Sequence, residues 1–457
     1  MSLEEQKNQV LELTEIALEK ARELNCDASI NVSVGKEYAT RFSNSEILQN
    51  YVDLMRLMEI TVVYKDKQRA ASTTNTFTKE NIINLVEFLA KVAKTVSPDP
   101  SYPGIVKEKH SYPSLKLNDP KASRVDPDYI ADRIAATINA GESIDKRIGG
   151  VSGNLLFSDG FEYHKSTAGN ELFYPSTVIE STININAISG GEESRSNSIF
   201  GNRFFDKLPL EKEAEEVAER ALRGLNAQSI EPGNYEVILD HQAVSTILFF
   251  VGYATSSRLI INRASFLNDR IGQQVFDEDL SLINDPHNPE HLSARPIDDE
   301  GLPTTKFPVI EEGVLKNYSY SRLDAARLGA KAQGTGFSFM GNAIGFPFAE
   351  TIQPGDMKVE EMIADIKNGL LVTNLHYTNF VNPPVGSITG MSKDGLFIIK
   401  NGEIVGSAKN MRFTDTIPNI LKEIDVGKEL KQPGGRFANI VVPIRTKNFR
   451  FTSKTSH

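Results

Sequence analysis

The sequence has few of the features that mark secreted or membrane-embedded proteins. Its 457 residues include one cysteine, Cys26, so an internal disulfide is excluded. The first residues, MSLEEQKNQV, lack the apolar stretch of a secretion signal. The longest apolar run, ILFFVGYA at 247–254, is far shorter than the roughly 20 residues that a bilayer-spanning helix requires. We therefore expect a cytoplasmic protein without a membrane span.

An excess of positive charge is also absent. Lysine and arginine contribute 50 residues against 60 aspartates and glutamates, which gives a formal net charge of −10. Nucleic-acid binding draws most of its free energy from basic residues that displace counterions, so we expect no nucleic-acid partner. The hydrophobic fraction of 40% nevertheless provides enough apolar surface for a globular fold.

Catalytic signatures are missing in the same way. None of the seven histidines is followed by glutamate, although zincin-type sites need a glutamate beside the first ligand to deprotonate the metal-bound water. His287 and His291, in HNPEH, match an inverted zinc motif only formally, because Pro286 and Pro289 prevent the helix that this motif requires. The serine in GSITG at 386–390 lacks the spacing of a nucleophile elbow. We predict an exposed loop at the two histidines, and no metal ligand or catalytic residue in this chain.

The pattern that is present predicts an α+β protein in which helices pack on largely antiparallel sheets. Helical spacing of apolar residues predicts a helix at 4–25, a second that Thr78 caps, and further helices near 126–140, 211–225 and 242–262. Alternating segments such as ASINVSV predict strands between them. Pro232-Gly233 is typical of a turn or loop between two structural units. We therefore expect an N-terminal α+β domain at residues 1–228 and a strand-rich C-terminal domain at 229–457.

Three glycine-containing dipeptides predict β-hairpin turns, because glycine and asparagine tolerate the positive φ values that tight turns require. They are Asp-Gly at 159–160, Gly-Gly at 190–191 and Asn-Gly at 401–402. We expect each of them to join two antiparallel strands.

A run of three acids distinguishes the segment RPIDDEGLPT at 295–304. One interpretation of Asp298, Asp299 and Glu300 is an exposed acidic turn. The other is a binding loop whose carboxylates contact the basic groups of a partner or the amides of a peptide. Gly301 would allow a positive φ, so the carboxylates could also cap neighbouring amides and hold the following strand in register.

From this segment onward the chain resembles the TldD/PmbA family. The acidic Asp-Glu-Gly turn of that family is matched by Asp298 to Gly301, and its "GVL" segment and alanine-rich helix are matched by EEGVLKNYSYSRLDAARLGAKAQGTG. FVNPPVGSITGMSKDGLFIIKNGEIVG resembles a later segment of the family through Asn382, Gly386, Gly395 and the residues from Asn401 to Ile404. The N-terminal half agrees more loosely, through RFSNSEILQN and RAASTTNTFTKENI.

The resemblance implies a two-domain α+β fold, assembly into dimers and, in TldD-type subunits, a zinc peptidase site. That site consists of His-Glu-x-x-x-His on a helix and a cysteine near the C-terminus. The corresponding helix here, QAVSTILFFVGYATS at 242–256, places Ser245, Thr246, Phe249 and Phe250 at the candidate positions, none of which binds zinc tightly. Cys26 lies in the wrong half, and the C-terminal LKQPGGRFANIVVPI contains no thiol. The chain therefore resembles the PmbA/TldE-like subunit.

The function that this resemblance implies is that of a non-catalytic subunit of a cytosolic TldD/TldE-type zinc metalloprotease, which degrades unfolded proteins or peptides. We expect a dimer, with a TldD-type catalytic subunit or with itself, that uses the second half and holds zinc only in a TldD-type partner. Peptide or partner binding would involve Asp298, Asp299, Glu300, Gly301, Asn382 and Gly386. Two alternatives stay open: an active metallopeptidase with a non-standard site, and a regulatory protein-binding factor, because the family also carries the name modulator of DNA gyrase.

Overall fold

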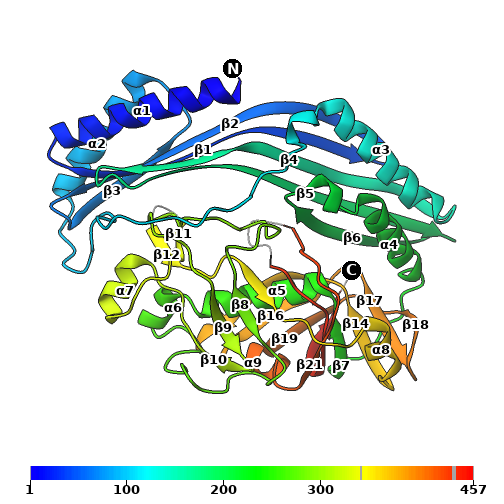
Figure 1. The fold of residues 1–457 in the computed structure, drawn as a ribbon. Coiled ribbons are helices and arrows are strands. Elements are labelled where there is room, and N and C mark those ends of the chain that lie inside the picture. The colour runs from blue at the N-terminus through cyan, green and yellow to red at the C-terminus, as the bar shows by residue number, and fades with distance from the viewer. Residues whose placement is uncertain (1, 340–341, 435–438, 456–457) are drawn as a thin grey trace.

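A long, six-stranded antiparallel sheet arches over the second half of the chain in the computed structural model, which describes residues 2–339, 342–434 and 439–455 (Figure 1). Its strand order is β3-β2-β1-β4-β5-β6. The bounds are β1 (Asp27–Ser43), β2 (Glu46–Tyr64), β3 (Gln68–Thr74), β4 (Ile148–Ser166), β5 (Glu171–Ser189) and β6 (Glu192–Asn202). ASINVSV and YATRFSN thus belong to one strand, β1, whose partners β2 and β4 extend along nearly its whole length.

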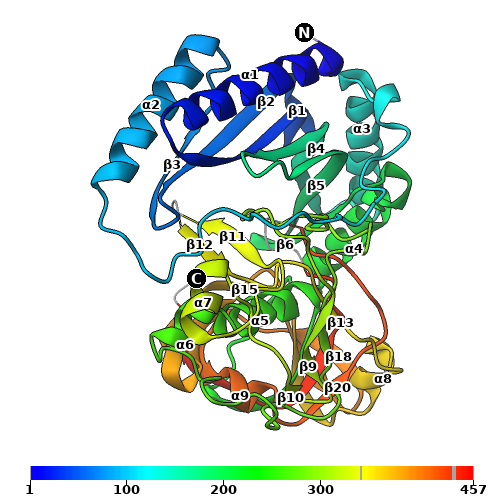
Figure 2. The same ribbon diagram turned by 60° about the vertical axis from the view of Figure 1, so that its left-hand side comes forward.

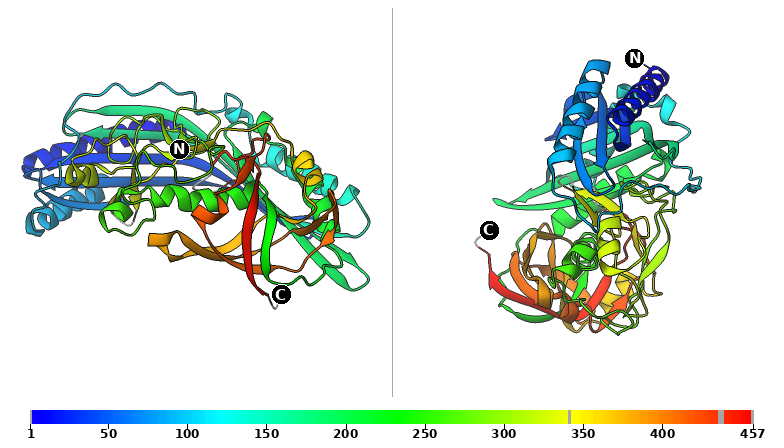
Figure 3. Two further views of the ribbon diagram at one scale, coloured as in Figure 1. Left: turned by 90° about the horizontal axis from the view of Figure 1, so that it is seen from below. Right: turned by 90° about the vertical axis from the view of Figure 1, so that its left-hand side faces the viewer.

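Four helices cover the convex face of this sheet, and the other face looks toward the second half (Figures 1 and 3). They are α1 (Leu3–Glu23), α2 (Lys79–Thr95), α3 (Pro127–Ser143) and α4 (Leu210–Arg223). The alternation in β1 explains the two faces, because Ile30, Val32 and Val34 are buried in the core beneath α1 and α2. Thr78 caps α2 as predicted, since its side chain accepts the N–H of Asn81.

The second half is built around a nine-stranded sheet, a four-stranded sheet and a hairpin. The nine-stranded sheet contains β7 (Gly233–Leu239), β14 (Asn368–Val372), β15 (Leu375–Asn382), β16 (Ser387–Ser392), β17 (Leu396–Lys400), β18 (Glu403–Ser407), β19 (Met411–Thr416), β20 (Ile424–Val426) and β21 (Ile444–Lys454). The four-stranded sheet contains β8 (Leu282–Asn284), β9 (Phe307–Glu311), β10 (Val314–Leu315) and β13 (Glu350–Ile352), and the hairpin consists of β11 (Gly336–Phe339) and β12 (Asn342–Gly345).

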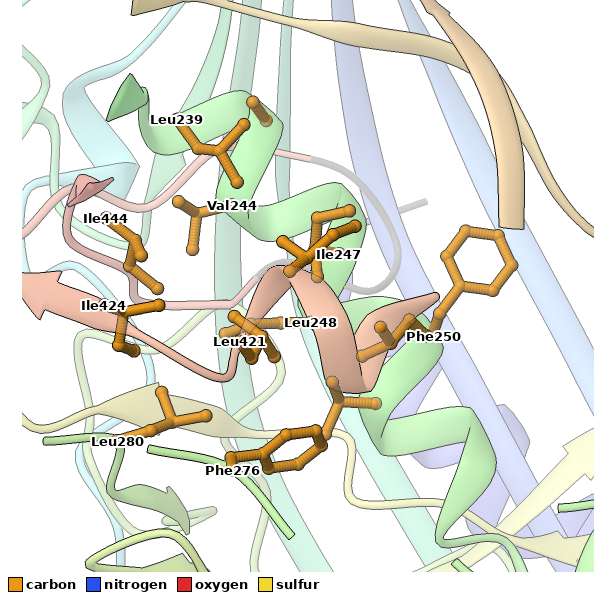
Figure 4. Packing of buried hydrophobic residues seen from close by; sticks show 14 of the residues in the cluster. Leu239, Val244, Ile247, Leu248, Phe250, Phe276, Leu280, Leu421, Ile424 and Ile444 are labelled. Atoms are coloured by element: carbon orange, nitrogen blue, oxygen red, sulfur yellow. The ribbon is translucent and has the colours of Figure 1, made fainter. Parts of the chain in front are cut away.

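The remaining helices are α5 (His241–Ala254), α6 (Ser257–Ile261), α7 (Arg322–Leu328), α8 (Val359–Ala364) and α9 (Ile417–Ile420). The apolar face of α5 is the centre of the core of the second half (Figure 4). Val244, Ile247 and Leu248 pack there with residues from β20 and β21, including Ile424 and Ile444. The prediction of a single helix at 242–262 is wrong. Two helices, α5 and α6, are separated at Ser256, which forms a β-bridge with Ser319.

Two of the three predicted hairpin turns are confirmed. Gly190 and Gly191 join β5 to β6, and Asn401 and Gly402 join β17 to β18, all with positive φ. The Asp-Gly pair at 159–160 is instead part of β4, opposite Gly35 on β1. A Cβ on Gly160 would lie 2.5 Å from the Gly35 Cα, so this glycine serves a close approach between strands.

The α+β class with helices packed on largely antiparallel sheets is confirmed, β7 and β14 being a parallel pair. The segment between α2 and α3 returns along the underside of the six-stranded sheet, between the two halves (Figures 1 and 2). Within the described ranges, no helix has the length and apolar character needed to cross a membrane.

Candidate functional site

The predicted acidic turn lies where the six-stranded sheet meets the second half. Asp298 is only 2% exposed, so the interpretation as an exposed turn is wrong for this residue. Its Oδ1 accepts the N–H groups of Glu300 (3.0 Å) and Leu302 (2.8 Å), and its Oδ2 accepts that of Gly336 on β11 (2.9 Å). Gly301 has a φ of +93°, as the sequence suggested. The Asp298 carboxylate thus caps amides of its own turn and fixes that turn to β11.

Asp299 connects the turn to the polar face of the six-stranded sheet. Its main-chain oxygen accepts the side-chain N–H of Asn31 on β1 (3.0 Å), and its carboxylate accepts the Ser338 N–H (2.7 Å) and pairs with Arg295 (2.7 Å). The Ser338 hydroxyl donates to Glu59 on β2 (3.0 Å). Residues from both halves therefore share one hydrogen-bonded contact.

Glu300 and Gly301 hold the segment that crosses between the halves. Glu300 accepts the main-chain N–H of Arg322 at the start of α7 (2.7 Å), and the Arg322 guanidinium donates to the Gly104 oxygen (2.5 Å). The Tyr112 hydroxyl donates to the Gly301 oxygen (3.0 Å). The turn is therefore a junction of three chain segments.

Burial raises the pKa values of several carboxyl groups at this junction. It raises the pKa of Asp298 to about 8, with a further contribution from the charge of Glu300, and it also raises the pKa of Glu300. On the sheet, burial raises the pKa of Glu162 to about 7. The pKa of Glu59 is raised by burial and by the neighbouring Asp299. The junction therefore carries less negative charge near neutral pH than its composition suggests.

Three cavities surround Asp299, and we call them the inter-half cavities. Their volumes are about 330, 530 and 470 Å³, and Asp299 lines all three. Asn31, Ser33 and Glu162 line the two larger ones from the sheet. In β1 the polar residues of ASINVSV thus face the cavities, while the apolar residues between them face the helices. Carboxylates, hydroxyls and amides line this space, so it suits ligands with many hydrogen-bonding groups.

The predicted exposed loop at His287 and His291 is wrong for His291. The segment is irregular, but His291 has no exposed surface, and burial lowers the pKa of its imidazole to about 4. Its Nδ1 accepts the Ser293 N–H (3.1 Å), so the neutral ring donates from Nε2 to the Glu350 oxygen (3.2 Å). His287 Nε2 lies 3.0 Å from the Thr304 oxygen. Both rings therefore serve main-chain contacts, and the prolines shape a covered loop.

Arg203, at the start of the chain after β6, explains why this loop is covered. Its side chain is 3% exposed, and burial lowers the pKa of the guanidinium to about 10. The guanidinium donates to main-chain oxygens of the loop, at His291, Leu292 and Ala294. It also donates to the main-chain oxygens of Leu117 and Thr177 and to the hydroxyl oxygen of Ser176, and the latter two residues belong to β5. An isolated arginine in the sequence gave no signal for this role, because its acceptors are mostly main-chain oxygens, in segments far apart in sequence.

Helix α5 offers aromatic rings where the resemblance places zinc ligands. The Phe250 side chain of α5 is buried (Figure 4) and meets Phe380 edge to face, with ring centroids 4.9 Å apart. Phe249 stacks on Tyr253 and also contacts Phe346. Thr246 donates its hydroxyl to the Gln242 oxygen one turn earlier (3.0 Å). These positions do not fit a zinc ion. Among the described residues, no three His, Cys, Asp or Glu side chains are grouped to hold a metal; residues 435–438 of the C-terminal segment lie outside them.

A buried carboxyl group lies against the same helix. Glu350 on β13 has no exposed surface, and neither of its carboxyl oxygens has a hydrogen-bond partner among the described residues. A Cβ on Gly252 would lie 2.6 Å from its Oε2, so glycine in α5 makes room for this side chain. Burial raises the pKa of Glu350 well above its ordinary value, because the charged form would lie in an environment without water or a hydrogen-bond donor among the described residues.

The structure does not bring Asn382 and Gly386 together with the acidic turn, since neither residue lines an inter-half cavity. Asn382 ends β15, and Gly386 has a φ of +69° in the turn to β16. A Cβ on Gly386 would lie 2.8 Å from the Phe266 ring, so the position requires glycine for both backbone and space. The binding role that the sequence suggested for these two residues stays a prediction.

Comparisons with known proteins agree with this architecture. A family model described as the PmbA/TldA metallopeptidase C-terminal domain matches residues 232–453. "Metalloprotease PmbA" of Escherichia coli O157:H7 is 25% identical over 438 residues, which cover 94% of this chain and 93% of that protein. A metalloprotease of Methanocaldococcus jannaschii is 30% identical over 212 residues, 46% of this chain and 47% of its own.

Two solved structures share the fold. TldE from Thermococcus kodakarensis superimposes with a TM-score of 0.87 at 21% identity, covering 96% of this chain and all of that one. A Thermotoga maritima MSB8 protein, described as a proposed modulator of a DNA gyrase, has a TM-score of 0.83 at 19% identity and covers 97% of this chain. The sequence relatives, the matched C-terminal domain and the shared fold together place this chain in the PmbA/TldD family.

Proposed function

We propose that this chain is a non-catalytic, PmbA/TldE-like subunit of a TldD/TldE-type zinc metalloprotease that acts on unfolded proteins or extended peptides. The observation that carries the proposal is the packing of α5. Phe249 and Phe250 make aromatic contacts at the positions where a zinc site would need ligands. Phenyl rings supply no lone pairs to a divalent ion, so this helix has no means to activate a metal-bound water.

The inter-half cavities are the proposed place for an extended peptide. A peptide backbone offers one N–H and one C=O per residue, and the cavity walls present matching groups from Asn31, Ser33, Glu162 and Asp299. Carboxylates form their strongest hydrogen bonds with cationic donors. We therefore expect peptides with lysine or arginine side chains to bind more tightly than acidic peptides of the same length.

Catalysis would come from a TldD-type partner that carries its own zinc, and this chain would contribute substrate-binding surface to the pair. The names of the relatives support this pairing, since they include metalloproteases of both the PmbA and the TldD type. A cytoplasmic location and a dimeric state, with that partner or with a second copy, belong to the same proposal.

Peptide binding can be measured with fluorescently labelled, unfolded peptides that differ only in having lysine or glutamate at alternate positions. Glu162→Gln keeps the shape and the oxygen that accepts the Ser33 hydroxyl, but it removes the ionisable group from two cavities. We expect it to weaken binding of the basic peptide about fivefold or more, equivalent to about 1 kcal/mol. Glu192→Gln, at an exposed position on β6, is the matched control. Equal affinity for both peptides, or no difference between the two variants, would contradict a peptide site here.

A further inference from the structure

Basic side chains gather at the smallest of the three inter-half cavities, which has a volume of about 330 Å³. The residues with a positive charge in its lining are Lys67, Arg69, Arg258 and Arg322. The cavity of about 470 Å³ adjoins it and shares four lining residues with it: Glu59, Ala71, Asp299 and Ser338. Among the described residues, the lining of that larger cavity contains acids but no basic side chain. The two adjoining spaces therefore differ in charge, and the smaller one suits an anion.

Two of these cations, Lys67 and Arg322, are half-buried and form no ion pair with a carboxylate of the described residues. The Lys67 ammonium donates to two main-chain oxygens of the segment between α2 and α3, at Pro100 (2.9 Å) and Tyr102 (2.8 Å). The Arg322 guanidinium donates to two further main-chain oxygens of the same segment, at 2.5 and 3.3 Å. An ammonium has three N–H groups and a guanidinium five, so both cations keep donors for another acceptor. A charge partly withdrawn from water is more stable beside an opposite charge.

The acidic residues that line this cavity do not supply the opposite charge. Asp99 and Asp299 each pair at 2.7 Å with an arginine that lies outside the lining. Burial raises the pKa values of Glu59 and Glu300, which disfavours the charged forms of both carboxyl groups. The two cations therefore remain available to an anion from outside the chain.

A phenol group adds a further donor to the same cavity. Tyr102 belongs to the lining, and its hydroxyl has no hydrogen-bond partner in the part of the chain that the structure describes. Burial raises the pKa of this phenol, so the hydroxyl keeps its proton and can donate it in a hydrogen bond. A carboxylate has about four acceptor positions on its two oxygens, and its hydrogen bonds with cationic donors are stronger than those between neutral groups. The donors of this cavity thus match a carboxylate.

We propose that this cavity binds the C-terminal carboxylate of a peptide that lies in the inter-half cavities, with Lys67, Tyr102 and Arg322 as its donors. The inference rests on the proposed function and adds the direction of the bound peptide. The cavity is the smallest of the three, and the segment between α2 and α3 lines it from Val96 to Ile105, so it suits the end of a chain better than its middle. Unfolded chains of any sequence share this terminal group, so its capture gives affinity without a sequence preference.

The experiment measures binding of the full chain to unfolded peptides of one lysine-containing sequence, each labelled at its N-terminus. The last residue is glutamine with a free carboxylate, glutamine with a terminal amide, or glutamate with a terminal amide. The free acid is expected to bind about tenfold more tightly than the glutamine amide. The net charge of the chain, −10, would by itself favour the amide, so the expected preference has the opposite sign. The glutamate amide should bind like the glutamine amide, within about twofold.

The three peptides separate this inference from the proposed function. Equal binding of the free acid and the glutamine amide overturns the inference and leaves the proposed peptide site standing. A glutamate amide that binds as tightly as the free acid overturns the assignment to the peptide end, because its carboxylate belongs to a side chain. A chain that binds none of the peptides contradicts the proposed function and this inference with it.

Two variants test the position of the site. Lys67→Met keeps a long unbranched side chain and removes the charge, and Tyr102→Phe removes only a hydroxyl that has no partner among the described residues. Each should reduce the preference for the free acid to about threefold or less and change the affinity for the amide by less than about twofold. Lys91→Met is the matched control, because Lys91 is exposed on α2 and lines none of the inter-half cavities. If Lys67→Met does not fold, Tyr102→Phe decides alone. A preference that Tyr102→Phe retains, or that Lys91→Met loses, overturns the proposal.

Discussion

Asp298→Asn is the substitution that most sharply tests how the acidic turn is built. The carboxylate accepts three main-chain N–H groups, two at Oδ1 and one at Oδ2. An asparagine that keeps its oxygen at the Oδ1 position turns its NH₂ group toward the Gly336 N–H, so one buried donor loses its acceptor. Leaving a buried polar group unsatisfied costs about 1–3 kcal/mol. We expect a loss of this size in the free energy of unfolding at pH 5.

The pH dependence of this loss carries the second part of the prediction. The folded-state pKa of Asp298, about 8, lies above its ordinary value of 3.8. Below pH 3.8 the group is protonated in both the folded and the unfolded chain, so the protein has its full stability there. As the pH rises from 3.8 through about 8, stability is lost, because the group releases its proton more easily in the unfolded chain. Each pH unit in this window is worth at most about 1.4 kcal/mol, so between pH 5 and pH 8 the natural protein loses at most about 4 kcal/mol from this group. The asparagine variant loses none of it.

The assay is urea unfolding of both proteins at pH 5 and at pH 8. The destabilisation caused by Asp298→Asn should shrink or reverse at the higher pH. Asp206→Asn is the control, because that carboxylate is 67% exposed and pairs with Lys121 at the surface. It should change stability by less than about 0.5 kcal/mol at either pH. A destabilisation by Asp298→Asn that is the same at both pH values would refute the reasoning about burial and charge.

Three further substitutions test other parts of the structure by urea unfolding. Arg203→Lys keeps the charge, but the three N–H groups of lysine leave at least three of the six acceptors of Arg203 without a donor. The substitution should therefore lower the free energy of unfolding by about 3 kcal/mol or more. A loss below about 1 kcal/mol would contradict the role of Arg203 in joining the loop to the sheet. Glu350→Gln removes a group whose raised pKa lowers stability as the pH rises, so the variant should gain relative to the natural protein between pH 5 and pH 8, and an equal slope would be inconsistent with a buried acid. Thr78→Ala removes the cap of α2 and should cost about 1 kcal/mol, which an unchanged midpoint would disprove.

Local patterns predicted most of the elements of this fold. The helical spacing of apolar residues in α1, the N-cap at Thr78 and the hairpin turn at Gly190 depend on residues close together in sequence, and the structure contains all of them. The break in the predicted helix at Ser256 depends on pairing with Ser319, which is distant in sequence. The Asp-Gly pair at 159–160 failed as a turn for the same reason, because its role is set by Gly35 on another strand.

The site was predictable only in part. Three consecutive acids before Gly301 drew attention to the turn, and its amide-capping geometry follows from that sequence. Its burial does not follow, because it results from the six-stranded sheet that lies over the turn. Glu59 and Glu162 gave no signal of their own, since an acid in an alternating strand is ordinarily a solvated residue. Their contribution to the cavities becomes visible only when the polar face of the sheet is placed against the second half.

The most direct test of the central claim is the rate at which the purified chain, incubated with zinc, cleaves an unfolded protein, measured alone and after addition of a TldD-type subunit. The aromatic contacts of α5 predict no cleavage by the chain alone and zinc-dependent cleavage by the pair, faster than that of the TldD-type subunit by itself. Cleavage by this chain alone that a chelator abolishes and zinc restores would contradict the account.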